Sequence, residues 1–415
     1  MEDGPRRWRE IAYDAFERWV ALLLRWEGRT PLAWRNLVGR GGKLLLASAG
    51  IGFAVFLMFM QIGFRNALFD NTVQLARLLK ADFFLVSPAR YNLPSEQRFD
   101  RLWLDRARAV EGVQRIVPVY IERSITQLRV VGNKSRSIRA VGIPLEPGVV
   151  EPPQWQPLLA MLTDGRTALL DRRTKPSYGF ARGDVQSLRQ QEVELSGKQL
   201  RIIDQVSIGT DFVHDGTLMF SDRAMAYYFP SRNPGGDPLQ LVDLGLVQLA
   251  EGADVGKVRR TLQSLTGNRL DVLSRSQIIA REIHFWATAT PIGIIFTIGT
   301  LMGLVVGVII CYQILFTEIN DHMAEFATLK AMGYRNQYFF GLILKQALYL
   351  TLFGFLPGLL ATLGAFAILG ESTGLVMRMT AGRMALVFGL TLLMCLISGL
   401  IALRKLLQTD PASLF

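Results

Sequence analysis

The sequence is poor in the residues that build disulfides, metal centres and nucleophilic active sites. Its 415 residues include two cysteines and three histidines. Cys311 and Cys395 both fall inside long apolar stretches, so no disulfide framework is expected in a soluble part. His214, His284 and His322 are far apart in the sequence and are expected on different sides of a membrane or near its edge, which argues against a shared metal site.

A phosphate-binding loop is also missing. No Gly-x-x-x-x-Gly-Lys-Ser/Thr motif occurs in the sequence, and without it the phosphates of ATP have no cradle. The acidic residues Asp211 and Asp215 have no nucleophile nearby, and turn or cap roles explain both. We therefore expect no catalytic residue, no metal and no cofactor in this chain, and any ATP and Mg²⁺ would be bound by a partner.

Acidic residues are outnumbered by basic ones, with 35 Asp and Glu against 46 Lys and Arg. A basic balance can indicate nucleic-acid binding, but here the charges are scattered arginines or fall in the 43 residues before the first apolar run. Half of the chain is apolar, which is typical of several membrane spans with one soluble domain. Charges that orient the chain in a membrane explain the basic balance better than nucleic acid does.

Long apolar runs are what the sequence has in abundance. A span needs about 20 mostly apolar residues to cross about 30 Å of hydrocarbon. Four segments meet this requirement, namely Leu44–Phe64, Pro291–Phe316, Ala347–Leu369 and Met384–Leu403. The first is interpreted as a retained anchor, because the residues before it are charged throughout and lead into a run of full length.

The basic residues that flank these runs predict the orientation. Short loops rich in Lys and Arg stay in the cytoplasm. Such residues lie before the first run, between the second and third, and after the fourth (Arg35, Arg40, Lys43, Lys330, Arg335, Lys345, Arg404 and Lys405). We expect a multi-pass protein of the bacterial inner membrane with both termini cytoplasmic. The long segment after the first run then lies outside, since long domains translocate largely regardless of charge.

That outside segment has mixed α and β patterns. Alternating runs on either side of Gly197 and Lys198 predict a hairpin inside a β-rich insert at about 167–230, and Asp254 is placed to cap a helix. The stretch 65–80 lacks Gly and Pro, and a second helix from Ser274 is expected to run on into the second span. Two stiff helical stalks would then join this domain to the membrane.

The predicted fold is an α-helical membrane protein with four spans and a mixed α/β extracytoplasmic domain between the first two. Its parts are an N-terminal cytoplasmic or interfacial amphipathic helix (1–30), a segment leading into the first span (31–65), the outside domain with its stalks (66–290), the second span (291–316), a cytoplasmic helix (317–337), the third span (338–369), a short outside loop (370–383), the fourth span (384–403) and a cytoplasmic tail (404–415). Trp8, Trp19 and Trp26 mark the apolar face of the first helix.

The loop between the second and third spans has an amphipathic pattern. Ile319, Met323, Phe326, Ala327 and Leu329 share one helical face, Glu318, Asp321, Glu325 and Lys330 cover the remainder, and Gly333 closes the helix as its C′ residue. Such a helix can lie along a membrane and dock a partner. The simpler interpretation is a connector stabilised by its own i,i+4 pairs.

The run from Glu325 to Gly333 resembles the coupling helix of FtsX-like permeases of the MacB group of ABC systems. The segments Leu32–Leu37 and Gly50–Gly52 are similar to that group's approach to its first span. Further runs resemble the DevC subfamily of exporter permeases, namely Pro31–Trp34, Phe56–Arg65, Ala67–Asp70 and Asp410–Ala412. The similarity to this subfamily covers nearly the whole chain after residue 30, and the order and spacing of these segments carry it.

The resemblance implies a homodimer that binds two cytoplasmic ATPase subunits, a periplasmic membrane-fusion adaptor and an outer-membrane channel. ATP hydrolysis would move the spans and so the outside domains, a mode called mechanotransmission, and a tripartite efflux system of this kind would export a lipid-like or amphiphilic substrate. The residues implied to contact the ATPase are Glu318, Asp321, Met323, Glu325, Phe326, Leu329, Lys330 and Gly333. The alternative is an FtsX-like regulator of an extracytoplasmic cell-wall hydrolase, and the length of the insert favours the exporter.

A row of glycines in the second span predicts close helix packing. Gly293, Gly299, Gly303 and Gly307 fit a face of small residues, which lets two helices approach closely. This face could form the seam of the dimer, or it could pack against other helices of the same subunit. The sequence leaves both interpretations open.

Overall fold

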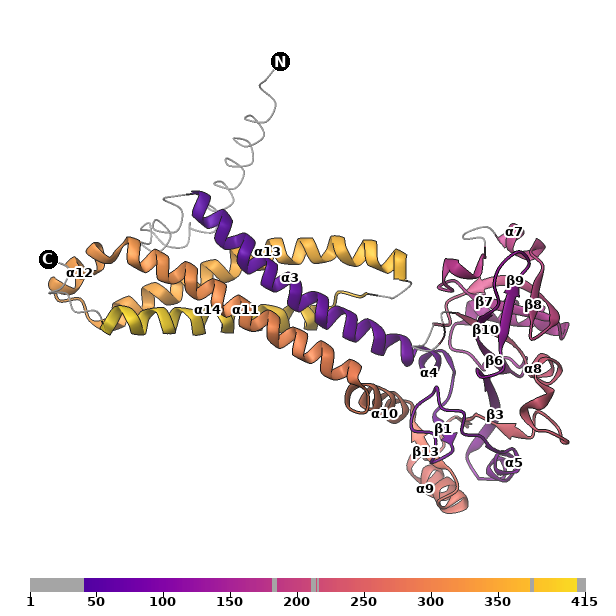
Figure 1. Ribbon diagram of the computed structural model, residues 1–415. Coiled ribbons are helices and arrows are strands. Elements are labelled where there is room, and N and C mark those ends of the chain that lie inside the picture. Colours follow the sequence, from indigo (N-terminus) through magenta and orange to yellow (C-terminus); the bar gives the residue numbers. More distant parts are fainter. Residues whose placement is uncertain (1–40, 181–184, 210–213, 215, 374–376, 409–415) are drawn as a thin grey trace. The chain divides into compact units, whose positions relative to one another are not determined.

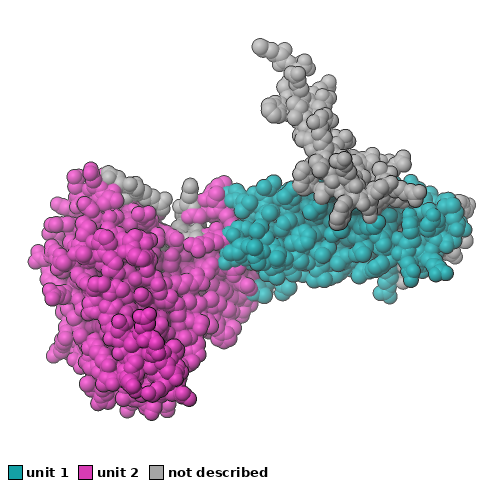
Figure 2. Space-filling view, turned by 180° about the vertical axis from the view of Figure 1, so that it is seen from behind, with its two compact units in different colours: residues 1–62, 297–365, 379–415 teal, residues 63–296, 366–378 magenta. Residues whose placement is uncertain are grey.

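The computed structural model describes residues 41–180, 185–209, 214, 216–373 and 377–408 (Figure 1). The chain divides into two compact units, coloured separately in Figure 2. We call residues 1–62, 297–365 and 379–415 the helical unit, and residues 63–296 and 366–378 the sheet unit. The predicted N-terminal helix and the motifs at 31–37 and 410–412 lie outside the described residues.

Long helices make up the helical unit. They are α3 (Gly41–Thr72), α11 (Pro291–Asp321), α13 (Asn336–Thr373) and α14 (Ala381–Gln408), with the short α12 (Met323–Ala331) between α11 and α13. Within the described part of the chain, four stretches are long and apolar enough to cross a membrane, namely Leu44–Thr72, Pro291–Asp321, Asn336–Gly370 and Ala381–Arg404. Each contains one of the four spans predicted from the sequence.

Small residues bring these helices together. A side chain at Gly358 of α13 would meet the carbonyl oxygen of Gly52 at 2.6 Å and the side chain of Val55, so α3 and α13 touch backbone to backbone. The hydroxyl of Ser398 on α14 donates to the carbonyl oxygen of Val308 on α11 at 2.9 Å. In lipid the hydrophobic effect does not drive helices together, so they associate through close packing and hydrogen bonds of this kind.

The sheet unit is built on one sheet of eleven strands in the order β13-β1-β12-β3-β6-β10-β7-β9-β8-β4-β5. Its first four strands are β13 (Asp271–Ser274), β1 (Phe83–Val86), β12 (Leu244–Leu249) and β3 (Val113–Glu122), all antiparallel to their neighbours. With α5 (Leu102–Arg108) after β1 and α9 (Val255–Thr266) before β13, they form a βαββαβ unit of the ferredoxin-like type.

The remaining strands are inserted between β3 and β12. They are β4 (Gln127–Val130), β5 (Arg136–Ser137), β6 (Arg139–Ile143), β7 (Thr167–Asp171), β8 (Val193–Leu195), β9 (Lys198–Val206) and β10 (Thr217–Ser221), with helices α6 (Gln156–Ala160), α7 (Val185–Gln190) and α8 (Asp222–Tyr228). A short pair outside the large sheet joins β2 (Phe99–Asp100) to β11 (Leu241–Val242). The β-rich part thus includes β4 to β6 in addition to the strands of the predicted 167–230 insert.

Local sequence signals fix several of these elements. Asp254 caps α9 by accepting from the backbone N–H groups of Gly256 and Lys257, as predicted. The predicted hairpin is also confirmed, because β8 and β9 pair across a turn in which Ser196 and Gly197 both have positive φ. Alternation then sends side chains to two cores, since Phe83 and Leu85 pack on the α5 and α9 face and Phe84 and Val86 on the opposite face.

The expected continuous helix from Ser274 into the second span is wrong. Ser274 does cap a helix, α10 (Arg275–Thr288), with a complete capping box. That helix ends before Ala289 and Thr290, and α11 begins at Pro291. Proline has no N–H to continue the helical ladder and disfavours the helical conformation at the residue before it. The hydroxyl of Thr290 instead donates to the carbonyl oxygen of Trp286 at 2.7 Å.

Candidate functional site: the helix between the second and third spans

The turn from α11 into α12 is organised around a histidine. His322 lies between the two helices with φ −106° and ψ 17°. Its Nε2 is 3.4 Å from a carboxylate oxygen of Glu318, and its Nδ1 is 3.2 Å from one of Glu325. The histidine therefore ties the last turn of α11 to the first turn of α12.

The other end of α12 is closed by the glycine that the sequence singles out. Gly333 has φ +88° and donates its N–H to the carbonyl oxygen of Lys330 at 3.1 Å, while Tyr334 donates to Leu329 at 3.2 Å. These two bonds form a Schellman motif, which confirms Gly333 as the C′ residue. The helix also has Glu325 in its first turn and Lys330 in its last, the placement that suits the helix dipole.

One face of this helix is buried within its own unit. Ile319 and Phe326 are 1% and 3% exposed, and Ala327 is buried beside them. The ring of Phe326 packs edge-on against Phe339 of α13 with 6.0 Å between centroids. Met323 and Leu329 pack against the same cluster. Three of the predicted contact residues, Met323, Phe326 and Leu329, therefore hold α12 in place, and Phe326 offers almost no surface to a partner.

The outward face of α12 carries the remaining predicted residues. Asp321, Glu325 and Gly333 are exposed, and Glu318 and Lys330 are half-buried. This face is mixed in charge, with carboxylates at the end nearest α11 and Lys330 followed by the exposed Arg335 at the other end. Contact of these residues with an ATPase stays a prediction.

Sequence reasoning missed three large side chains next to this face. Met332 is 63% exposed, Tyr334 45% and Tyr338 39%, and the two tyrosine rings contact each other at a tilt of 53° with 4.8 Å between centroids. Their signal was three bulky residues within seven positions, but the amphipathic analysis stopped at Gly333. Exposed aromatic and methionine side chains are enriched in protein interfaces.

The glycines of α11 contact helices of their own chain. A side chain at Gly299 would meet the amide of Gln61 on α3 at 2.5 Å, and one at Gly303 would meet Met58 at 3.2 Å. Gly307 faces Met394 of α14, while Gly293 lies against the backbone of Ala287. Packing within one subunit, one of the two interpretations left open by the sequence, therefore accounts for Gly299, Gly303 and Gly307. The exposed face of α11 is a different one, formed by Ile294, Ile295, Ile298, Leu301, Met302, Val305 and Ile309.

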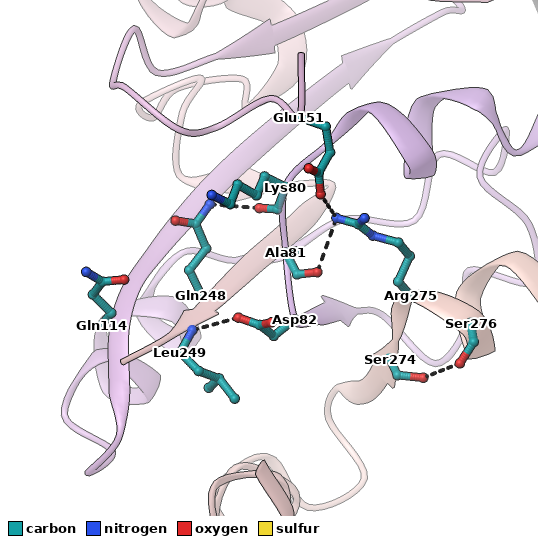
Figure 3. A pocket seen from close by; sticks show the side chains of 10 residues that line it. All are labelled: Lys80, Ala81, Asp82, Gln114, Glu151, Gln248, Leu249, Ser274, Arg275 and Ser276. Carbon is teal, nitrogen blue, oxygen red and sulfur yellow. Dashed lines mark hydrogen bonds and ion pairs between the residues drawn. The ribbon is translucent and has the colours of Figure 1, made fainter. Parts of the chain in front are cut away.

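A polar hollow of about 520 Å³ lies in the sheet unit where its two connections to the spans meet (Figure 3). Arg275, the first residue of α10, donates to the carbonyl oxygen of Leu79 at 3.0 Å and to Glu151 at 2.5 Å. Asp82 accepts from the backbone N–H of Leu249 across the hollow at 2.8 Å. Ser274 and Ser276, the hydroxyl side chains that line it, are hydrogen-bonded to each other at 2.9 Å. Among the described residues, no group of three or more His, Cys, Asp or Glu could hold a metal. The contacts of Arg275 beside this hollow hold the start of α10 against the end of α4 (Gln74–Leu78).

Comparison with known proteins connects the helical part to a family. Residues 286–411 match the model of the FtsX-like permease C-terminal family. Among curated proteins, none matches the chain. The match spans α11, α12, α13 and α14, so the similarity to this family lies in the helical part of the molecule. The chain is a multi-pass membrane protein, and its predicted fold class is confirmed.

Two solved structures resemble the sheet unit. The periplasmic region of MacB from Actinobacillus actinomycetemcomitans is similar at 13% identity and a TM-score of 0.33, covering 48% of this chain and 92% of that one. The extracellular domain of the ABC-type transporter YknZ from Gram-positive bacteria is similar at 12% identity and a TM-score of 0.30, covering 47% of this chain and 100% of that one.

Proposed function

We propose that this chain, whose last four helices are similar to the FtsX-like permease family, is the membrane subunit of an ABC-type exporter driven by a separate ATPase. The observation that carries the proposal is the construction of α12. It is fixed to α11 through His322 and to α13 through Phe326, so a force on its outward face reaches two spans together. A connector without such anchoring would absorb the force in its own bending.

The membrane orientation follows from the basic residues at the loop and the ends. Lys330, Arg335 and Lys345 support a cytoplasmic position for α12 under the positive-inside rule, with the sheet unit outside. Both termini are cytoplasmic in this arrangement. An ATPase binds α12 from the inside, and the sheet unit meets an adaptor on the outside.

The finer assignments complete the proposal. The subunit works as a homodimer, with a periplasmic membrane-fusion adaptor and an outer-membrane channel, and it exports a lipid-like or amphiphilic substrate by mechanotransmission. A dimer contact through α11 would use its exposed apolar strip, because its glycines are occupied by α3 and α14. Lipid acyl chains can cover the same strip, so they compete with a second subunit for contact with it.

The proposal is tested on the full chain purified from membranes together with its ATPase. The variant Glu325→Lys reverses an exposed charge in the first turn of α12, at the acidic end of its outward face. We expect roughly tenfold weaker association with the ATPase, equivalent to about 1.4 kcal/mol, and loss of the ATPase stimulation that the permease produces. Glu251→Lys is the matched control, since it reverses an exposed charge in the sheet unit.

Two further variants separate docking from folding. Glu325→Ala removes the contact with His322 without reversing the charge, and Met332→Asp places a charge on the most exposed of the missed residues. If neither Glu325→Lys nor Met332→Asp changes ATPase binding or activity, α12 is not the docking surface. If a cell-wall hydrolase copurifies in place of an adaptor, the regulator is the correct alternative.

A further inference from the structure

A chain of buried polar contacts begins in the middle of α10. Glu282 is 2% exposed, and one of its carboxylate oxygens accepts the backbone N–H of Leu93 at 2.6 Å. The other oxygen accepts the indole N–H of Trp286, one turn further along α10, at 2.8 Å. Leu93 belongs to residues 87–98, a segment without regular secondary structure that joins β1 to β2, which we call the 87–98 connector. The side chain of Leu93 packs in the same apolar cluster as Ile278 of α10.

Arg90 connects the 87–98 connector to Asp243, which lies just before β12. Arg90 donates to the carbonyl oxygen of Leu93 at 2.8 Å and to that of Gln97 at 3.2 Å, so its guanidinium gathers the connector into a loop. Its third contact is a salt bridge of 2.5 Å to Asp243, just before β12. Both side chains are at most 1% exposed.

Beyond Asp243 the contacts reach the root of the inserted strands. Asp243 also accepts from Arg232 at 2.7 Å and from the backbone N–H of Ile121 at 2.8 Å. Arg232 and Arg98 both contact Glu122, at 3.2 and 2.7 Å. Glu122 is the last residue of β3 before the inserted strands, and Arg232 ends the 3₁₀ turn Pro230–Arg232 that follows α8 on the way back. The cluster therefore sits where the chain leaves the four-stranded unit and returns to it.

Such a cluster is a costly way to stabilise a fold. A buried ion pair contributes little relative to apolar residues of the same shape, whereas removal of one partner leaves an uncompensated charge and costs about 3 to 5 kcal/mol. Groups held in this way keep their geometry until the whole set comes apart. A rigid connection between α10 and the root of the inserted strands is the consequence.

We propose that the 87–98 connector is the link by which α10 sets the position of the inserted strands, with Glu282 and Arg90 as its positioning residues. This inference rests on the proposed function, because it takes α10 to be displaced when α11 is moved from the cytoplasmic side. When Glu282 moves, its hydrogen bond displaces Leu93. Leu93 and Gln97 accept hydrogen bonds from Arg90, so Arg90 moves with them. Arg90 then displaces Asp243 and, through it, Arg232. The inserted strands then follow α10 through the connector, in addition to the contact of Arg275 with Glu151 in the segment between β6 and β7.

Hydrogen–deuterium exchange on the full chain assembled with its ATPase tests the link. In the wild type, a non-hydrolysable ATP analogue should change the exchange of α10 and of the strands β4 to β10. In Glu282→Met, which keeps the side-chain volume and removes both acceptors, the change should persist in α10 and become clearly smaller in the inserted strands, where the contact of Arg275 with Glu151 remains. Stimulated ATPase activity should be unaltered, which separates this result from failure of the proposed function, where α10 itself does not respond.

Two companion variants distinguish a link from a merely structural contact. Glu282→Gln keeps one acceptor and should restore part of the response, and it carries the test if the methionine variant does not fold. Trp286→Phe removes the indole donor but keeps the bond to Leu93, so its inserted strands should respond like the wild type. The proposal is overturned if the inserted strands respond equally in Glu282→Met and the wild type, or if they do not respond in the wild type while α10 does.

Discussion

Buried polar groups have local partners in the helical unit and distant partners in the sheet unit. In the helices, buried hydroxyls turn back on their own backbone, as Thr351, Thr362 and Thr391 each donate to the carbonyl oxygen four residues earlier at 2.7 to 2.8 Å. In the sheet unit, full charges are buried and matched between distant segments, as in Arg90 with Asp243. A chain in lipid must satisfy its polar groups locally because the surroundings offer no water. A water-exposed domain gains enough from apolar burial to hold an internal ion cluster.

The comparison also explains how each unit is held together. The helical unit relies on shape, since glycines let α3 and α13 touch, and the unit has no buried cluster of opposite charges comparable to Arg90, Asp243 and Arg232 among its described residues. The sheet unit relies on two apolar cores on the two faces of one sheet, with the ions at a junction between segments. Each can therefore be damaged by a change that would be tolerated in the other.

The largest expected effect comes from opening the ion cluster. Asp243→Asn keeps the shape of the side chain but removes the carboxylate that Arg90 contacts and leaves Arg232 with Glu122 alone. We expect the free energy of unfolding of the sheet unit to fall by about 3 to 5 kcal/mol. Chemical denaturation of the full chain in detergent, followed by a fluorescence probe in the sheet unit, measures the change.

Asp105→Asn is the control for this prediction, because its partner Arg108 is 42% exposed and the pair is solvated. A surface pair of this kind contributes no more than about 1 kcal/mol. Equal losses of unfolding free energy in the two variants would show that the buried cluster stabilises the sheet unit no more than a surface ion pair does.

A middle-sized effect is expected from filling the contact between α3 and α13. Gly358→Val places carbon atoms where the carbonyl oxygen of Gly52 and the side chain of Val55 already lie. Overpacking of this kind costs about 1 to 3 kcal/mol. The melting temperature of the helical unit should fall while that of the sheet unit stays unchanged, as measured by thermal unfolding with a probe in each unit.

Gly364→Val tests whether the loss comes from crowding. It makes the same chemical change on the same helix, six residues further on, and a side chain there would meet nothing within 4 Å. A comparable loss in Gly364→Val would mean that helix propensity, and not packing between α3 and α13, decides the result.

The smallest expected effect is a dependence of stability on pH. Burial raises the pKa of Glu282 more than its bonds from Leu93 and Trp286 and the nearby charges of Arg123 and Arg281 lower it. A carboxyl group whose pKa is raised in the folded state contributes stability below its unfolded pKa of about 4.3, and that contribution is lost as the pH rises through the folded pKa. The wild type should therefore lose stability relative to Glu282→Gln as the pH rises above about 4.

Melting curves of the two full-length proteins over a pH series measure this difference. The sign is informative, because a carboxylate stabilised mainly by its hydrogen bonds would give the opposite slope. A difference that stays constant with pH would show that the folded and unfolded pKa values of Glu282 are equal.

Sequence reasoning reached the elements whose cause is local. The four apolar runs needed only length and hydropathy, the start of α9 needed Asp254, and the end of α12 needed Gly333. It was wrong at the start of the second span, where Pro291 separates α10 from α11. The proline is visible in the sequence, and its missing N–H is a local reason for the break.

What the sequence alone determined is therefore which segments are helices, strands and spans, because period, caps and apolar length act within a few residues. Only the tertiary structure decided what these segments contact. It turned Gly299 and Gly303 toward α3 of the same chain, buried Phe326 against Phe339, and brought Arg90 to Asp243 across 153 positions. Contacts between distant residues depend on how all elements pack at once, and no local pattern encodes that arrangement.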